Sequence, residues 1–159
     1  ETGGWNMARY QRTVRLCLPA EQVEDAMQTF LTQNRFYFSQ WQGETCWAAD
    51  QGPARQVRFF QYRYDGETLT LTAWLRQGIQ GESGLDGWAA LDQKVPYRRA
   101  LFDLCRRLLE SSPEKGQTQD WMKAEQSRLR RQGSIFVLAL LAAGALIAWT
   151  MARWFPFAA

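Results

Sequence analysis

The C-terminal third of the chain contains a long stretch, residues 132–152, without a charged side chain, and its centre at 135–149 is apolar without interruption. A helix needs ~20 apolar residues to cross the ~30 Å hydrocarbon layer of a bilayer, and this stretch reaches that length. A buried helix of a globular domain would show a polar stripe, which is missing here. The pattern predicts a transmembrane helix over residues 132–154. A hydrophobic tail docked onto the domain is the alternative.

Charged residues beside this stretch predict its orientation. Basic residues gather before it, whereas only Arg153 follows it, together with aromatic side chains. Because positive residues stay on the cytoplasmic side, the preceding domain should be cytoplasmic and the tail at 155–159 external. The membrane-proximal basic residues are Lys123, Arg128, Arg130 and Arg131. We expect them to face the lipid bilayer.

Small residues recur at intervals of four along the same stretch, at Gly144, Ala148 and Ala152. Stripes of this kind let two helices approach closely. We expect this stripe either to pair two copies of the chain as a homodimer or to reflect the ordinary alanine content of an apolar helix.

Composition excludes several kinds of chemistry. The chain has 159 residues, of which 46% are hydrophobic and 22% charged, so it can fold one domain besides the apolar helix. It contains no histidine, which removes the commonest general base and metal ligand. Cys17, Cys46 and Cys105 form no CxxC pair and are typical of buried thiols in a reducing compartment. We predict no catalytic residue, no metal and no cofactor.

The N-terminal part has the periodicities of a small α+β domain. Alternating or aromatic-rich runs predict strands at 10–18, 36–41, 45–48, 57–64 and 68–76. Apolar residues at helical spacing predict a helix that starts after Pro19 and another at 97–111. The order β-α-β-β-β-β-α predicts an antiparallel sheet with two helices on one face, as in helix-grip or TATA-binding-like arrangements. These are analogies of fold and carry no function.

The expected boundaries follow from these patterns. Residues 1–6 precede Met7 and read as a translated leader or a cloning scar. Residues 7–112 form the α+β domain, and residues 113–131 form a linker and a basic juxtamembrane helix. The apolar helix at 132–154 and the tail complete the chain.

Tryptophans supply the candidate binding surface. Trp74 should point away from the leucine face of its strand. We expect Arg58, Phe60, Tyr62 and Tyr64 of the preceding strand to form an aromatic-arginine face on the same side of the sheet as Trp74. Such residues either pack in the core, line an apolar pocket or anchor a partner protein. Base stacking is a further use, but the net charge of +3 makes nucleic acid an unlikely partner. The candidate surface comprises Trp41, Trp47, Arg58, Phe60, Tyr62, Trp74 and Trp88.

The glycine-rich segment at 77–94 has no nucleotide-binding signature. Its glycines recur every third residue, at 78, 81, 84 and 87, but neither a P-loop nor GxGxxG is present. The carboxylates of Glu82, Asp86 and Asp92 would repel phosphate. We expect a loop or an irregular strand.

Three short motifs carry a resemblance: residues 41–44 (WQGE), 73–76 (AWLR) and 84–88 (GLDGW). With them, residues 10–109 resemble uncharacterised bacterial single-span membrane proteins, which implies location in the inner membrane and no known activity. Some members carry a zinc ribbon at the N-terminus. This chain lacks one, so the resemblance implies no metal site. We expect a membrane-anchored binding or scaffold module with an unknown protein partner. A helix-grip pocket for an apolar or lipid ligand is the alternative.

Overall fold

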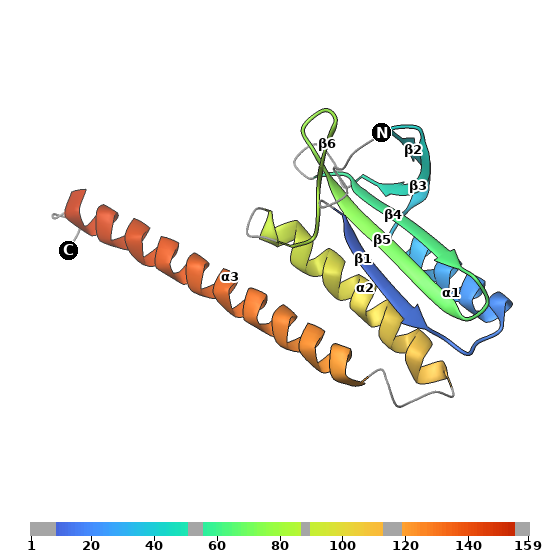
Figure 1. The fold of residues 1–159 in the computed structure, drawn as a ribbon. Helices are drawn as coiled ribbons and strands as arrows, with labels where there is room; N and C mark the ends of the chain where they lie inside the picture. The colour runs from blue at the N-terminus through green and yellow to red at the C-terminus, as the bar shows by residue number, and fades with distance from the viewer. Residues whose placement is uncertain (1–8, 51–55, 87–89, 113–118, 155–159) are drawn as a thin grey trace, which may run out of the picture.

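The computed structural model describes residues 9–50, 56–86, 90–112 and 119–154 of the chain. They form a body of strands and helices from which one long helix projects (Figure 1). The elements in chain order are β1 Tyr10–Arg15, α1 Ala20–Gln33, β2 Tyr37–Trp41, β3 Glu44–Ala49, β4 Arg58–Tyr64, β5 Thr68–Gln77, β6 Gly81–Ser83, α2 Leu91–Ser111 and α3 Gln119–Trp154.

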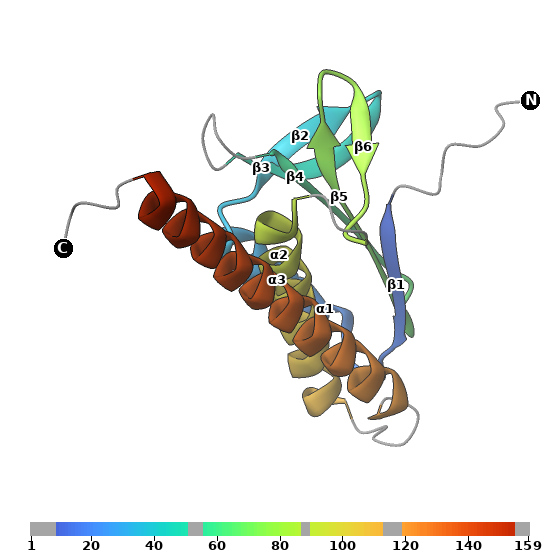
Figure 2. The same cartoon turned by 90° about the vertical axis from the view of Figure 1, so that its left-hand side faces the viewer.

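The strands form one antiparallel sheet in the order β1-β5-β4-β3-β2, with β6 paired to β5. Helices α1 and α2 cover one face of this sheet, and α3 lies beside α2 (Figure 2). The predicted α+β class and antiparallel sheet are therefore confirmed. Two hairpins, β2–β3 and β4–β5, join neighbouring strands of this sheet.

The turn between β2 and β3 fixes the register of that hairpin. Gln42 and Gly43 both have positive φ, 51° and 83°, as a two-residue type I′ turn requires. Trp41 and Glu44 therefore stand opposite each other at the end of the ladder. Every other residue of β2 then turns to the same face.

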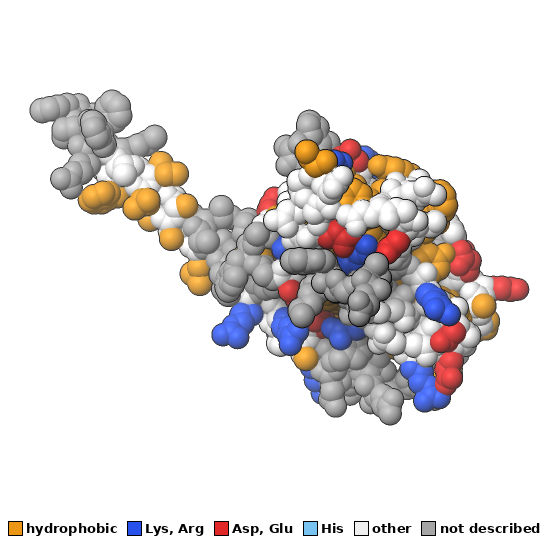
Figure 3. Space-filling model, turned by 45° about the horizontal axis from the view of Figure 1, so that its top comes forward, with side chains coloured by type: hydrophobic (Ala, Val, Ile, Leu, Met, Phe, Trp, Pro, Cys, Tyr) orange, Lys and Arg blue, Asp and Glu red, His pale blue; other side chains and the backbone are white. Residues whose placement is uncertain are grey.

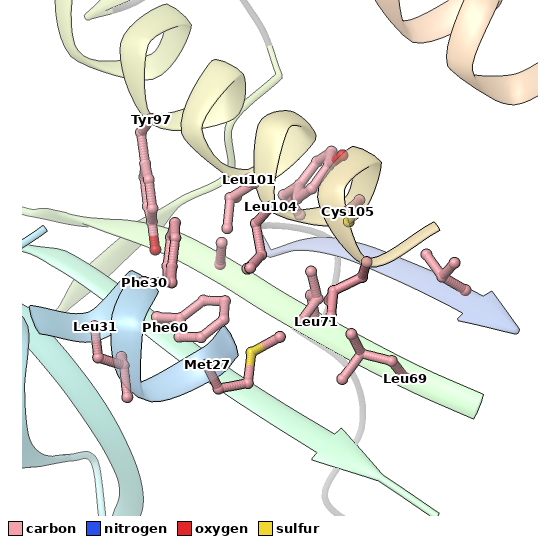
Figure 4. Packing of buried hydrophobic residues seen from close by; sticks show 14 of the residues in the cluster. Met27, Phe30, Leu31, Phe60, Leu69, Leu71, Tyr97, Leu101, Leu104 and Cys105 are labelled. Carbon is pink, nitrogen blue, oxygen red and sulfur yellow. The ribbon is translucent and has the colours of Figure 1, made fainter. Parts of the chain in front are cut away.

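The main core lies between the sheet and the two helices (Figure 4). Leu69, Leu71 and Leu75 of β5 point toward the helices, as their period of two predicted. Helix α2 buries Tyr97 and Leu101, and all the apolar residues expected on its inner face are buried. The predicted inner face of α2 is confirmed at Tyr97, Leu101, Leu104, Cys105 and Leu108.

The expected transmembrane helix is wrong. None of the helices in the described part of the chain has the length and apolarity that crossing a bilayer requires. Helix α3 joins a charged first part, which contacts the body, to an apolar second part. The membrane anchor and the single-pass topology are corrected with it.

Two further boundaries differ from those predicted. The glycine-rich segment contains β6, which pairs with the end of β5 across a turn at Gly78. Helix α2 begins at Leu91, so Pro96 lies inside the helix and not at its start. A strand of three residues is too short to give a periodic signal, and an internal proline imitates a helix start.

The residues of β4 that were predicted to share a face with Trp74 are wrong by one position. Phe59 pairs with Trp74, whereas Phe60 pairs with Ala73 and belongs to the main core with Tyr62 and Tyr64 beside it. A shift of one residue moves a whole strand pattern to the other face. The aromatic-arginine face expected around Trp74 is therefore not assembled as predicted.

Candidate interaction surfaces

The tryptophans of the candidate surface lie on opposite faces of the sheet. Trp41 and Trp74 belong to a second cluster on the face away from the helices, the outer cluster, whereas Trp47 packs against the main core. Trp41 and Trp47 therefore do not line one cavity. Trp88 lies outside the described residues. The outer cluster comprises Trp41, Cys46, Ala48, Val57, Phe59 and Trp74.

The outer cluster is closed over Trp74. This side chain is fully buried; it stacks on Phe59 with the ring centroids 5.4 Å apart, and the guanidinium of Arg9 lies 4.1 Å from its ring centroid. Arg9 donates to both carboxylate oxygens of Glu82 at 2.7 Å, and Trp41 donates its indole N–H to the same carboxylate at 2.8 Å. The hydrogen bonds from Arg9 hold the pKa of Glu82 below its usual range. This arrangement stabilises the fold and leaves Trp74 inaccessible.

Arg58, Phe60 and Tyr62 lie on the helix side of β4. The Arg58 guanidinium lies 5.3 Å from the ring centroid of Tyr97 and donates to the carbonyl of Asn34 at 3.3 Å. Phe60 is fully buried in the main core. Tyr62 donates its hydroxyl to the carboxylate of Glu24 at 3.0 Å, at the rim of α1. These residues pack the body together and do not form one exposed surface.

A buried ion cluster, the arginine clamp, fixes the first part of α3 to the body. It consists of Arg12 on β1, Arg98 on α2 and Glu125 on α3. The side chains of Arg98 and Glu125 are each only 2% exposed. Arg98 donates to both oxygens of Glu125, and Arg12 donates to one of them at 3.2 Å. Three elements that are distant in the sequence thus meet at one carboxylate.

Sequence reasoning missed this clamp. Arg98 is buried and also donates to Asp86 at 2.8 Å. An arginine next to an inward-facing Tyr97 gives no local signal of burial, because its partner is on another helix. The basic residues expected near a membrane, Lys123, Arg128, Arg130 and Arg131, are all exposed on α3.

Beyond the clamp, α3 projects from the body as an apolar arm, residues 134–150. Figure 3 shows its hydrophobic side chains along the projecting helix. Gly144 faces open space and Ala148 is exposed, whereas the side chain of Ala152 lies outside those described. Among the side chains of the arm that the structure describes, the large apolar ones are more than half exposed; they are Val137, Leu138, Leu141, Leu146, Ile147 and Trp149.

No family model matches the chain, and no curated protein or solved structure is significantly similar to it. The arguments about function therefore rest on the geometry of the chain itself. Three features of that geometry are open to a ligand or partner: the arm, the grooves beside α1 and the free edge of the sheet.

The grooves beside α1 are open and are bordered by charged as well as apolar side chains. One of about 690 Å³ lies between α1 and β4 and is lined by Glu21, Glu24, Asp25 and Tyr62. Another of about 420 Å³ lies between α1 and α2, with Phe30, Asn34, Asp103 and Arg107 among its lining residues. Neither contains a tryptophan of the candidate surface.

The thiols are poorly placed for chemistry. Burial raises the pKa of Cys105 to about 12 and also raises the pKa of Cys46, so both are protonated at neutral pH. Cys17 is exposed and lies in the segment between β1 and α1. Within the described residues, no group of three or more Cys, Asp or Glu side chains is placed to hold a metal ion.

Proposed function

We propose that this chain is a non-enzymatic binding module that presents the apolar arm of α3 to a partner protein. The observation that carries the proposal is the exposure of the arm, where Leu138, Leu141 and Leu146 are each more than 60% exposed. Contiguous apolar surface on a globular protein marks an interaction site or a liability for aggregation. Covering these side chains with an apolar surface of another protein removes them from water.

The arginine clamp supports a defined direction for the arm. Breaking a buried ion pair is costly because it leaves a charge without a partner, so a clamp of this kind holds its elements in one arrangement. Glu125 lies about two turns before the arm begins on the same helix. The arm therefore leaves the body at an angle that the body sets.

The absence of histidine and the state of the thiols support a role without catalysis. Neither Cys46 nor Cys105 is exposed, and burial disfavours the thiolate of each. A nucleophilic thiol needs an exposed, electropositive setting. Binding requires neither group.

The alternative, a pocket for an apolar or lipid ligand, is less well supported. It was based on Trp41 and Trp47, which lie on opposite faces of the sheet. The grooves beside α1 carry charged side chains such as Glu21, Asp25 and Asp103. A ligand pocket encloses most of its ligand, whereas both grooves are open to solvent.

The test replaces Leu138, Leu141, Leu146 and Ile147 by glutamine in the full chain. These side chains are exposed, so the body should unfold at an unchanged denaturant concentration. The tagged chain should migrate in native gels of cell extracts as a complex larger than its own oligomer, and the variant should lose that complex. Replacing Arg128 and Arg130 by glutamine changes exposed polar positions on the same helix and should preserve it. A complex of unchanged size in the four-glutamine variant would show that the arm is not the binding surface.

A further inference from the structure

Strand β2 is an unprotected edge of the sheet. It lies at one end of the strand order, and β3 is its only partner strand in the described part of the chain. Edge strands pair readily with strands of other chains, and proteins usually block them with charges, prolines or bulges. The five residues of β2, Tyr-Phe-Ser-Gln-Trp, contain no charge and no proline.

The opposite edge of the same sheet is blocked. Strands β1 and β6 line it, and they carry Arg12, Arg15 and Glu82. Arg12 is held there by Glu125 of α3. The chain thus protects one edge with charge and leaves the other uncharged.

The hairpin geometry shows which backbone groups of β2 are directed outward. Trp41 and Glu44 flank the two-residue turn and exchange hydrogen bonds, so the pairs Ser39–Cys46 and Tyr37–Ala48 do the same. The alternate residues, Phe38 and Gln40, therefore direct their N–H and C=O groups away from β3.

Aromatic side chains stand on both faces of this edge. Phe38, on the helix side, is 64% exposed and makes an edge contact with Trp47, with the ring centroids 5.7 Å apart. Tyr37, on the outer side with Trp41, is 52% exposed. A strand added at this edge would cover an aromatic ring on each face.

We infer that β2 pairs with β2 of a second copy of this chain, in antiparallel orientation about a two-fold axis at Ser39. In this register Phe38 of each copy exchanges backbone hydrogen bonds with Gln40 of the other. Tyr37 of each copy stands opposite Trp41 of the other, and such aromatic cross-strand pairs are stabilising. The two sheets become one continuous sheet.

Self-complementarity of the strand selects this occupant. The five residues of β2 carry no charge, so the two-fold register sets no like charges against each other. Each end of the edge brings Tyr37 of one copy against Trp41 of the other. The same patch serves both copies, as a two-fold interface requires.

The test measures self-association of the full chain by sedimentation, in the four-glutamine background so that the arm does not contribute. Gln40→Pro removes an N–H that points outward and leaves the β2–β3 ladder intact, which edge strands tolerate. It should weaken dimerisation about tenfold or more, that is by about 1.4 kcal/mol. Gln40→Ala keeps the N–H and should dimerise normally.

A second pair of variants tests the same edge without introducing a proline, which could disturb the fold. Phe38→Lys places a charge on the edge and should also weaken the dimer at least about tenfold. Ile79→Lys changes an even more exposed apolar residue, 82% exposed in the turn before β6, and should have no effect. Hydrogen exchange should show protection of the Phe38 and Gln40 amides that grows with concentration. A monomeric chain, or a dimer that Gln40→Pro and Phe38→Lys leave unchanged, overturns the inference.

Discussion

At the scale of single residues, the body depends on polar atoms that are buried with their partners. Tyr97 is fully buried on α2 and donates its hydroxyl to the carbonyl of Phe59 on β4 at 2.7 Å. Burial raises the pKa of this hydroxyl, so it remains a donor throughout the neutral range. The bond links the helix to the sheet at the centre of the core.

Removing this hydroxyl should be costly. Tyr97→Phe leaves the ring in place but deprives a buried carbonyl of its donor, and we expect the free energy of unfolding to fall by about 1–2 kcal/mol. Tyr37→Phe, an identical change at a side chain that is 52% exposed, should alter it by less than about 0.5 kcal/mol. Urea unfolding of both variants measures the difference. Equal losses would mean that the Tyr97 hydroxyl is not part of the buried network.

The burial of a residue could be predicted where it follows from the local sequence pattern. It could not be predicted where a distant partner determines it. The alternation in β5 correctly placed Leu69 and Leu71 in the core and Trp74 on the other face. Arg98 looked like a surface residue because its partner, Glu125, lies on another helix. Pairing across such a distance follows from packing and leaves no trace in the local sequence.

At the scale of elements, the tight turns have the clearest signature in the sequence. Gln42-Gly43 and Asp65-Gly66 both join antiparallel strands, since their residues accept positive φ or cap the turn. The sequence does not show which residues of β4 face the helices, because Phe59 and Phe60 are consecutive and one is buried on each face of the sheet. Only the pairing with β5 decides which of the two faces the helices. The exposed edge at β2 likewise depends on the order of strands in the finished sheet.

The clamp should control the attachment of α3. Glu125→Ala removes the buried carboxylate from Arg98 and leaves it the exposed Asp86 as a partner, and we expect a loss of about 2–3 kcal/mol in the free energy of unfolding. Asp103→Ala breaks an exposed ion pair with Arg106 and should cost less than about 1 kcal/mol. Hydrogen exchange over the first part of α3 separates detachment of this helix from general unfolding. If exchange there stays slow in Glu125→Ala, the clamp is not what holds the helix.

At the scale of the whole molecule, the body and the arm have separate roles. The body fixes the direction of α3 through Glu125, and the arm offers apolar side chains beyond it (Figure 3). Pairing through β2 would place two arms on one particle. A partner with two binding sites would then be held more tightly than by either arm alone, provided that both arms reach it.

The measurement that tests the central claim most directly is photo-crosslinking in the cells that produce the chain. A photoreactive amino acid replaces Leu141 on the arm or, as control, Glu110 on α2; the side chains of both positions are 65% exposed. We expect one discrete protein adduct from position 141, identified by mass spectrometry, and none from position 110. The adduct should disappear when Leu138, Leu146 and Ile147 are replaced by glutamine. The absence of a protein adduct at position 141, or the same adducts from both positions, would contradict a binding role for the arm.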